Sequence, residues 1–363
     1  MNERERALHL YRRIERESLF ASLVLIGEPA AVRTIVLGIL RWRSRLDFAI
    51  DHYAKSKIEP EIRDVLRVGA YQLMFMDVAK YAAVAETVSL APKRARGFAN
   101  AILRRISEHA PEPNDLATRT AHAQWLIDRW IRHYGAAKAE AIANANQQLS
   151  YPDVLSLTGE APPDSEPSTL VEGIYKLRGS TADLDREKFW PMDEGSAAVA
   201  ALAAKQGSNI IDLAAAPGGK TLLMRTRGAN VVSNDVSLTR LLTLKHAKRV
   251  VSDARRTPFR RRFQVVLLDA PCSATGTIRK NPEIKWRLRE SDLASFAKLQ
   301  RELLASALEL ASETVVYSTC SLEPEENDEI VASSGAKIAG DPLRLTPDGG
   351  TDGFTAFVLK PPS

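Results

Sequence analysis

The chain has 363 residues, of which 45% are hydrophobic and 26% charged, values typical of a globular protein with two or three domains. No stretch of ~18 apolar residues is free of charge, which excludes a membrane-spanning helix. The formal net charge of +5 favours a polyanionic partner such as a nucleic acid.

Residues 1–110 predict an all-helical domain. Apolar residues recur there at helical spacing around 7–11, 35–40, 65–73 and 98–103. Arginines punctuate these helices: Arg12, Arg13, Arg41, Arg43, Arg45, Arg94, Arg96, Arg104 and Arg105. They form either solvated faces, whose stems cover apolar surface, or a surface that contacts phosphates.

The next part of the chain predicts a small α+β subdomain over residues 115–185. A break with two prolines at 110–114 is typical of a linker. Helical patterns resume at 124–130 and 136–145, and one strand is predicted at 154–157 within a mixed, Pro-rich stretch.

Residues 186–363 predict an α/β domain. Five short apolar runs are typical of buried strands, at 209–213, 231–235, 249–253, 264–269 and 314–318. Helical stretches separate them, the clearest at 293–311, and a strand at 354–359 closes the chain. This alternation predicts a mostly parallel, doubly wound sheet.

Both cysteines follow predicted strands, at the edge of the sheet where α/β proteins bind their ligands. Cys272 ends the sequence Asp-Ala-Pro-Cys that begins at Asp269, and Cys320 lies in Ser-Thr-Cys-Ser after the next strand. A cysteine taken alone is more often a small buried hydrophobe, and two cysteines without clustered histidines make a poor metal site, so we expect no metal. The charged start of the chain carries no secretory signal, so we expect a cytoplasmic protein with reduced thiols.

A loop of small residues follows the first strand of the α/β domain and opens a helix. It consists of Ala214, Ala215, Ala216, Pro217, Gly218, Gly219 and Lys220. Small residues let the backbone approach a ligand, and a helix N-terminus offers free N–H groups to an anion or a carboxylate. Ala214 stands where a P-loop needs glycine, and the three spaced glycines of the dinucleotide fingerprint are absent, so a P-loop nucleotidase is disfavoured.

Three aspartates end successive strands of the predicted sheet: Asp235, Asp253 and Asp269. Asp235 suits the hydroxyls of a ribose, and Asp253 could accept a hydrogen bond from an adenine amino group. Each of them alone is more often a turn or helix-capping residue. Together with the small-residue loop they line one crevice, which fits a nucleoside cofactor with a charged amino-acid end.

Several motifs resemble the signatures of the RNA 5-methylcytosine methyltransferases of the RsmB/Sun/NOP family. They lie at residues 212–220, 269–276, 276–286, 317–321 and 323–327. The helical front resembles the NusB-like RNA-binding domain of the bacterial RsmB branch at residues 67–73, 83–88 and 100–105. The resemblance covers most of the chain. It implies a Rossmann-like class I methyltransferase domain that uses S-adenosyl-L-methionine, small-subunit (16S) rRNA as the substrate, and a monomer.

The resemblance also implies what the site residues do. Cys320 is the nucleophile that adds to C6 of cytosine, which makes C5 reactive enough to take the methyl group, and Cys272 assists product release. Asp269 hydrogen-bonds the base near N3. Lys220 orients that site or meets the cofactor carboxylate, and its charge favours thiolate over thiol. The implied cofactor contacts are the loop 214–220, Asp235, Asp253 and Asp269.

The sequence departs from the family pattern at three places. Residues 151–157 lack the usual Arg-Val-Asn, Met192 replaces a common Gln, and the stretch 235–269 is short. One alternative is an RNA-binding, antitermination-like module whose methyltransferase domain is inactive. Another is a DNA cytosine methyltransferase, because such enzymes place the nucleophile in a Pro-Cys motif like the one that contains Cys272. Cys320 and the basic helical front favour RNA.

Overall fold

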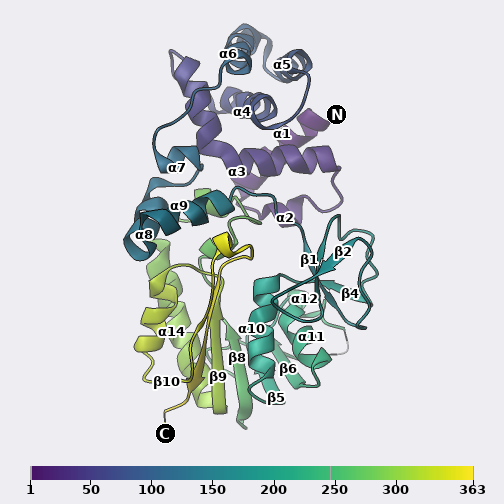
Figure 1. Cartoon of the computed structure of the whole chain (residues 1–363), viewed down its shortest axis with the longest axis vertical. Coiled ribbons are helices and arrows are strands. Elements are labelled where there is room, and N and C mark those ends of the chain that lie inside the picture. The colour runs from purple at the N-terminus through teal and green to yellow at the C-terminus, as the bar shows by residue number, and fades with distance from the viewer. Residues whose placement is uncertain (1, 246, 363) are drawn as a thin grey trace. The chain divides into compact units, whose positions relative to one another are not determined.

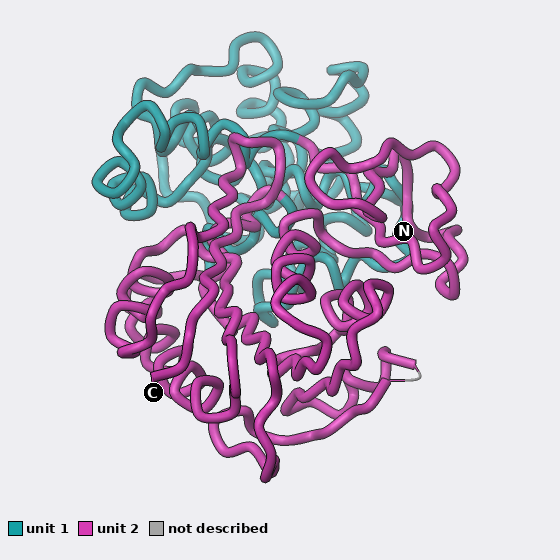
Figure 2. Tube along the Cα trace, turned by 60° about the horizontal axis from the view of Figure 1, so that its bottom comes forward, with its two compact units in different colours: residues 1–148, 280–287 teal, residues 149–279, 288–363 magenta. Residues whose placement is uncertain are grey.

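The computed structural model describes residues 2–245 and 247–362. The chain divides into two compact units (Figure 1, Figure 2). Unit 1 comprises Met1–Gln148 and Lys280–Arg287, and unit 2 comprises Leu149–Arg279 and Leu288–Ser363. Each unit has a hydrophobic core of its own.

The N-terminal part of unit 1 is helical, as the sequence predicts. Its helices are α1 (Glu3–Glu17), α2 (Ala21–Val24), α3 (Ala30–Tyr53), α4 (Pro60–Phe75), α5 (Lys80–Ser89) and α6 (Arg96–Glu108). Asn2 caps α1 by accepting from the backbone N–H of Glu5, and Pro60 occupies the first turn of α4, where its missing N–H costs nothing. The apolar faces of α1, α3, α4 and α6 form one core.

Three further helices belong to unit 1: α7 (Leu116–Arg119), α8 (Gln124–Tyr134) and α9 (Ala136–Ala145). α7 packs against α3, which joins this stretch to the helices before it. The strands that follow lie in unit 2. The boundary between the compact units therefore falls at residues 148–149 and divides the α+β subdomain predicted over residues 115–185.

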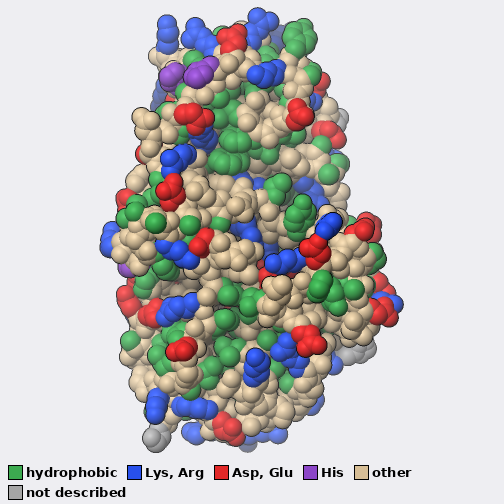
Figure 3. Space-filling model, viewed as in Figure 1, with side chains coloured by type: hydrophobic (Ala, Val, Ile, Leu, Met, Phe, Trp, Pro, Cys, Tyr) green, Lys and Arg blue, Asp and Glu red, His purple; other side chains and the backbone are tan. Residues whose placement is uncertain are grey.

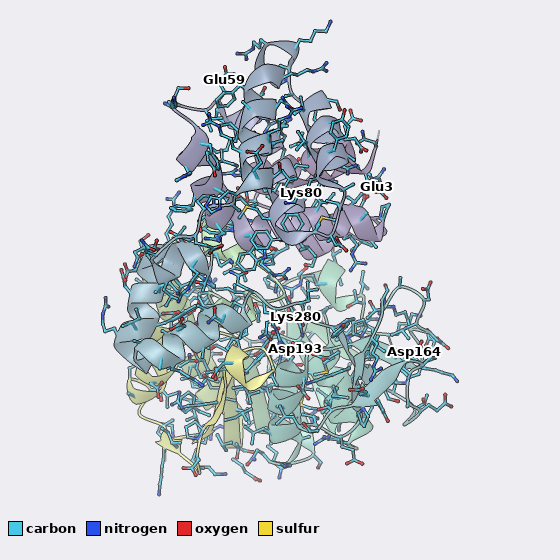
Figure 4. All side chains as sticks on the ribbon, turned by 45° about the horizontal axis from the view of Figure 1, so that its top comes forward. Glu3, Glu59, Lys80, Asp164, Asp193 and Lys280 are labelled. Carbon is cyan, nitrogen blue, oxygen red and sulfur yellow. The ribbon has the colours of Figure 1, made fainter. Side chains whose placement is uncertain are left out.

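A short segment from the second half of the chain completes unit 1. It runs from Lys280, labelled in Figure 4, through α13 (Ile284–Arg287). The indole N–H of Trp286 donates to the backbone carbonyl of Leu40 at 2.6 Å, and the ammonium of Lys285 donates to the carbonyl of Arg41 at 2.8 Å. These two carbonyls lie next to each other in α3, so the segment is bonded to the middle of that helix.

The close contact between α3 and α4 depends on Gly38. A Cβ built at Gly38 in α3 would lie 1.9 Å from Cζ of Tyr71 in α4. We expect Gly38→Ala to lower the stability of unit 1 by about 1–3 kcal/mol, the usual cost of overpacking a core. Gly97→Ala in α6 is the matched control, because nothing lies within 4 Å of its added Cβ. Denaturant unfolding should show a loss for the first variant only, and equal stabilities would contradict this packing.

Unit 2 contains a small antiparallel sheet with the strand order β2-β3-β1-β4. Its strands are β1 (Asp153–Ser156), β2 (Ser165–Pro167), β3 (Ile174–Leu177) and β4 (Phe189–Pro191). The sequence predicted β1 alone. The other strands are three or four residues long, and both β2 and β4 end in proline, so their patterns are weak.

The large sheet of unit 2 has the order β10-β12-β9-β8-β5-β6-β7, and β11 pairs with β12. Its strands are β5 (Asn209–Asp212), β6 (Asn230–Asp235), β7 (Lys248–Val251), β8 (Phe263–Asp269), β9 (Ala311–Thr319), β10 (Lys337–Ile338), β11 (Leu343–Leu345) and β12 (Phe354–Lys360). Strands β5 to β9 are parallel and β10 to β12 are antiparallel, which confirms the predicted α/β, Rossmann-like class. The order reverses between β5 and β8, and α/β sheets bind ligands at the carboxyl ends of such strands.

Helices cover both faces of the large sheet (Figure 1). α10 (Glu194–Ala204) and α11 (Gly219–Thr226) pack on one face, and α14 (Asp292–Leu310) packs on the other. Successive strand residues alternate between the faces: Ile210 points to the first and Ile211 to the second. Both faces are buried, which explains the continuous apolar runs in the sequence.

Side chains of Lys, Arg, Asp and Glu are interspersed over the face of the molecule in Figure 3. The net charge of +5 is therefore not gathered into one patch on that face. Of the helices described in residues 2–245 and 247–362, none combines the length and the apolar character needed to cross a membrane.

Candidate active site

The two cysteines meet at the carboxyl ends of β8 and β9. The strands are parallel neighbours whose last paired residues are Asp269 and Ser318, so both leave the sheet at the same edge. Just beyond this edge the Sγ atoms of Cys272 and Cys320 lie 3.4 Å apart. Both thiols are free and half-buried. The sequence placed each cysteine at a strand end, and the structure adds that the two sulfurs are in contact.

The contact changes the acidity of Cys272. The hydrogen bond with Cys320 raises the pKa of Cys272 well above its ordinary value, and burial and the negative charge of Glu326 act in the same direction. Cys272 therefore keeps its proton, and its S–H can donate to the sulfur of Cys320. Such a pair can supply a nucleophilic sulfur and a proton donor at one place.

Backbone contacts fix the loop that carries Cys272. The N–H of Gly276 donates to the carbonyl of Cys320 at 2.9 Å, and the N–H of Gly353 donates to the carbonyl of Gly276 at 2.7 Å. A Cβ added to Gly276 would lie 2.4 Å from the carbonyl oxygen of Gly353. Only glycine allows the backbones to approach this closely, so the loop, the Cys320 strand end and the C-terminal segment form one rigid edge.

Lys220 and Asp269 form an ion pair beside the thiols. The ammonium lies 2.6 Å from Oδ2 of Asp269 and donates to the hydroxyl of Ser196 at 2.6 Å. The other carboxylate oxygen accepts from the hydroxyl of Ser318 at 2.8 Å. Burial is the largest single influence and would lower the pKa of Lys220, but the charge of Asp269, its hydrogen bond and the charge of Asp212 together act more strongly, and the pKa is raised. Lys220 is therefore a permanent cation at this edge, with Asp269 as its direct partner.

The small-residue loop is held by the end of β6. Asp235 is buried, and its carboxylate accepts from the N–H of Ala216 at 3.1 Å and from the N–H of Ser237 at 2.9 Å. Gly218 has a φ of 118°, and a Cβ there would lie 2.2 Å from the side chain of Leu244. The structure therefore brings loop 214–220 and Asp235 together, and it gives Asp235 a role in shaping the loop.

Asp253 is not at a strand end, so that prediction was wrong. β7 lies at the edge of the sheet, is mostly exposed and ends at Val251, two residues before Asp253. The side chain of Asp253 is 41% exposed and pairs with Arg255 at 2.7 Å. This hydrogen bond, with one from the backbone of Arg255, lowers the pKa of Asp253 to about 2. Its partners are thus in its own loop and not among the other predicted site residues.

Three residues near the site were given no role by sequence reasoning: Ser196, Asp212 and Glu326. Ser196 contacts Lys220 from the first turn of α10, which Asp193 caps by accepting from the N–H groups of Gly195 and Ser196 (Figure 4). The N-cap pattern Asp-Glu-Gly-Ser was the available signal for that helix start. Asp212 and Glu326 lie within the motifs at residues 212–220 and 323–327. Their contacts, however, depend on the folding of the chain and could not be predicted from these motifs.

Asp212 is a buried carboxylate beneath the loop. It is 1% exposed, and its Oδ2 accepts from the hydroxyl of Thr221 at 2.8 Å. Its Oδ1 has no hydrogen-bond partner among the described residues. Burial raises the pKa of Asp212 from 3.8 to about 7, although Thr221 and the charge of Lys220 act against the shift.

The raised pKa of Asp212 predicts a stability that depends on pH. Between about pH 4 and pH 7 the folded protein holds a proton that the unfolded chain releases, so this residue's contribution to stability falls as the pH rises through that window. We expect Asp212→Asn, which is neutral and still accepts from Thr221, to be more stable than the parent at pH 8 and nearly equal at pH 4. One pKa unit corresponds to ~1.4 kcal/mol, so the gain at pH 8 should be a few kcal/mol at most. Urea unfolding at both pH values measures it, and an equal difference at both would contradict the assignment.

Two family models match the chain. One is described as "16S rRNA methyltransferase RsmB/F" and matches residues 199–340, and the other is the NusB family, which matches residues 1–108. A curated relative from Sodalis glossinidius, named ribosomal RNA small subunit methyltransferase B, is 32% identical and covers 92% of this chain and 87% of its own length. The protein of the same name from Serratia proteamaculans is 32% identical over 84% of this chain and 81% of its own.

Solved structures share the fold. The crystal structure of PH0851 superposes with a TM-score of 0.77 at 24% identity and covers 99% of both chains. The structure of NSun6 from Pyrococcus horikoshii with SFG gives a TM-score of 0.58 at 18% identity over 67% of this chain and 99% of its own. At these identities the likeness concerns the fold alone.

Proposed function

Since the chain belongs to the 16S rRNA methyltransferase RsmB/F family, we propose that it methylates carbon 5 of a cytosine in small-subunit ribosomal RNA. The observation that carries this reaction is the 3.4 Å contact between the sulfurs of Cys272 and Cys320. When bound, S-adenosylmethionine, the cofactor of this family, supplies an electrophilic methyl group.

Cys320 is the proposed nucleophile. Carbon 5 of cytosine is too weak a nucleophile by itself, and addition of a thiolate at C6 turns the C5 position into an enamine-like carbon. The raised pKa of Cys272 disfavours its thiolate and so argues against Cys272 as the attacking sulfur. A neighbouring cation stabilises a thiolate, and Lys220 is the cation beside the two thiols.

Cys272 is the proposed release residue. After the methyl group is on C5, the C5 proton is lost to water, the electrons of that bond re-form the C5–C6 double bond, and the C6–Cys320 bond breaks with its electron pair on sulfur. Cys272 touches Cys320 and is therefore placed to assist this elimination. Its thiol can return a proton to the departing sulfur.

Asp269 and Lys220 are proposed to hold the base and its charge. Asp269 would contact the cytosine near N3 through a shared proton, which neutralises the negative charge that thiolate addition at C6 places on the ring, and its bonds to Lys220 and Ser318 keep the carboxyl group oriented. Fixed partners of this kind need no reorganisation during the reaction.

The cofactor is proposed to lie against loop 214–220 and Asp235, with Asp253 as a further contact. The fit rests on the small residues of the loop, among them Gly218, whose positive φ and close approach to Leu244 exclude a side chain, and on the N–H groups at the start of α11. Calorimetric titration with S-adenosylmethionine tests this binding, and no binding would favour the alternative of an RNA-binding module with an inactive domain.

Bisulfite sequencing of ribosomal RNA tests the proposed activity. RNA from cells with and without the gene should differ at one or a few cytosines of the small-subunit RNA. No difference there, or a difference in DNA alone, would contradict the proposal. We further propose a cytoplasmic monomer, and light scattering coupled to size exclusion measures the oligomeric state.

A further inference from the structure

The loops of the two cysteines share one buried carboxylate. Glu326 ends the short helix η3 (Pro324–Glu326) and has no exposed surface. Its Oε1 accepts from the backbone N–H of Ser273 at 2.8 Å, and its Oε2 accepts from the hydroxyl of Ser321 at 2.5 Å and from the hydroxyl of Ser273. Ser273 directly follows Cys272, and Ser321 directly follows Cys320. One side chain thus bonds to the neighbour of each thiol.

Glu326 is itself held in place from several sides. The amide of Gln300 in α14 donates to its Oε1 at 3.0 Å and also to the carbonyl of Pro271 at 2.9 Å. The hydroxyl of Tyr317 donates to the backbone carbonyl of Glu326 at 2.6 Å. The carboxylate is therefore a fixed point, anchored to the helix α14 and to the strand β9, rather than a flexible arm.

The buried carboxylate of Glu326 is surrounded by neutral hydrogen-bond donors. The donors that the described residues present to the carboxylate are two hydroxyls, one amide and one backbone N–H, all of them neutral. Removing a carboxylate from water is costly, and apolar side chains of similar volume often give equal or better stability than buried charged groups. The carboxylate at this position is therefore best explained by the arrangement that it imposes on the two cysteine loops, and not by a contribution to stability.

We propose that Glu326 is a positioning residue that sets the separation of the two thiols and thereby links formation of the RNA adduct to its release. It acts through Ser273 and Ser321 and touches neither the substrate nor the cofactor. The inference rests on the proposed function for its kinetic consequence, but its geometric consequence can be measured without RNA.

The side-chain bonds of Glu326, which substitution would remove, are unequal, and this sets the direction of the expected effect; the bond from Tyr317 reaches the backbone carbonyl and is kept. The Cys272 side receives the two bonds to Ser273 and a third link through Gln300 to Pro271, whereas the Cys320 side receives one bond, to Ser321. The negative charge of Glu326 also contributes, after Cys320 and burial, to the raised pKa of Cys272. Loss of Glu326 should therefore disturb release, the step of Cys272, more than attack, the step of Cys320.

The kinetic test uses the full chain with Glu326→Leu, Glu326→Gln and the control Asp328→Asn. Asp328 forms an exposed ion pair with Arg344 just beyond Glu326, and pairs of this kind contribute little. In single-turnover reactions with 16S rRNA, Glu326→Leu should release its adduct about tenfold more slowly than the parent, which corresponds to about 1.4 kcal/mol. Adduct formation should change less, so adduct should accumulate. A loss of folded protein alone would lower both rates and would not raise the adduct fraction.

The geometric test uses phenylarsine oxide, a trivalent arsenical that bonds to two thiols at once. The parent and Asp328→Asn should bind it tightly, and Glu326→Leu should bind it about tenfold more weakly, again the factor for about 1.4 kcal/mol. Glu326→Gln keeps the shape of the side chain and one acceptor oxygen, so its slowing of adduct release and its weakening of arsenical binding should both be smaller. It replaces the leucine variant in both tests if that variant does not fold.

Parental release rates together with parental arsenical affinity in folded Glu326 variants would overturn the inference. A different result would separate the two proposals. If the parent forms no adduct with any RNA, but Glu326→Leu still weakens arsenical binding, the proposed function is refuted and the positioning role of Glu326 remains supported.

Discussion

Cys320→Ala should lose methyl transfer to RNA by roughly four orders of magnitude or more, as expected when a covalent nucleophile is removed. Without the sulfur, no bond forms at C6 and C5 stays unreactive. The variant should fold normally, because Cys320 is half-buried and the loss of one sulfur leaves only a small space. Transfer of a labelled methyl group from S-adenosylmethionine to 16S rRNA measures the effect.

The control for this variant is cofactor binding. Cys320 contacts Cys272 and makes no hydrogen bond to loop 214–220 in the described site, so binding of S-adenosylmethionine should stay within about twofold of the parent, a difference below ~0.5 kcal/mol. Residual methyl transfer near the parental rate would show that Cys320 is not the nucleophile. Equal losses of transfer and of cofactor binding would show a structural effect.

Cys272→Ala should trap the reaction after the nucleophile has attacked. Cys320 is intact in this variant, so the bond to C6 forms, but the thiol that assists elimination is missing. We expect a protein–RNA adduct that survives denaturing electrophoresis and contains most of the enzyme, with a turnover rate lowered by roughly 10²–10⁴-fold, the range for a lost proton-transfer group.

The reverse pattern would exchange the two roles. An adduct with Cys320→Ala, and none with Cys272→Ala, would place the nucleophile in the Pro-Cys sequence, as in the DNA enzymes. The double variant, which lacks both sulfurs, should form no adduct in either case and controls for non-specific cross-linking.

The core of the sheet was predictable because burial on both faces leaves a clear pattern. The apolar runs that contain Val266 and Val315 became the parallel neighbours β8 and β9, so Cys272 and Cys320, which follow them, lie at one edge. β7 is an exposed edge strand without the burial on both faces that gives the inner strands a clear pattern, and its end was mispredicted by two residues. Because of that error Asp253 was expected at the end of the strand, whereas it lies in the loop that follows.

Contacts between distant parts of the chain could not be predicted. Nothing in the sequence around Trp286 says that its indole meets the carbonyl of Leu40, so the place of Lys280–Arg287 in unit 1 emerges only from the fold. The same holds inside the site. The motif around Glu326 was visible, but its bonds to Ser273 and Ser321 depend on tertiary packing.

The identity of the attacking sulfur is tested most directly by mapping the adduct. RNA that carries 5-fluorocytosine cannot lose a proton from C5 after methyl transfer, so it should hold the unmodified enzyme in a stable covalent complex. Protease digestion and mass spectrometry then locate the attached nucleotide. The predicted result is a nucleotide on the peptide that contains Cys320, with a methyl group added. A nucleotide on the peptide that contains Cys272, or no covalent complex at all, would contradict the account.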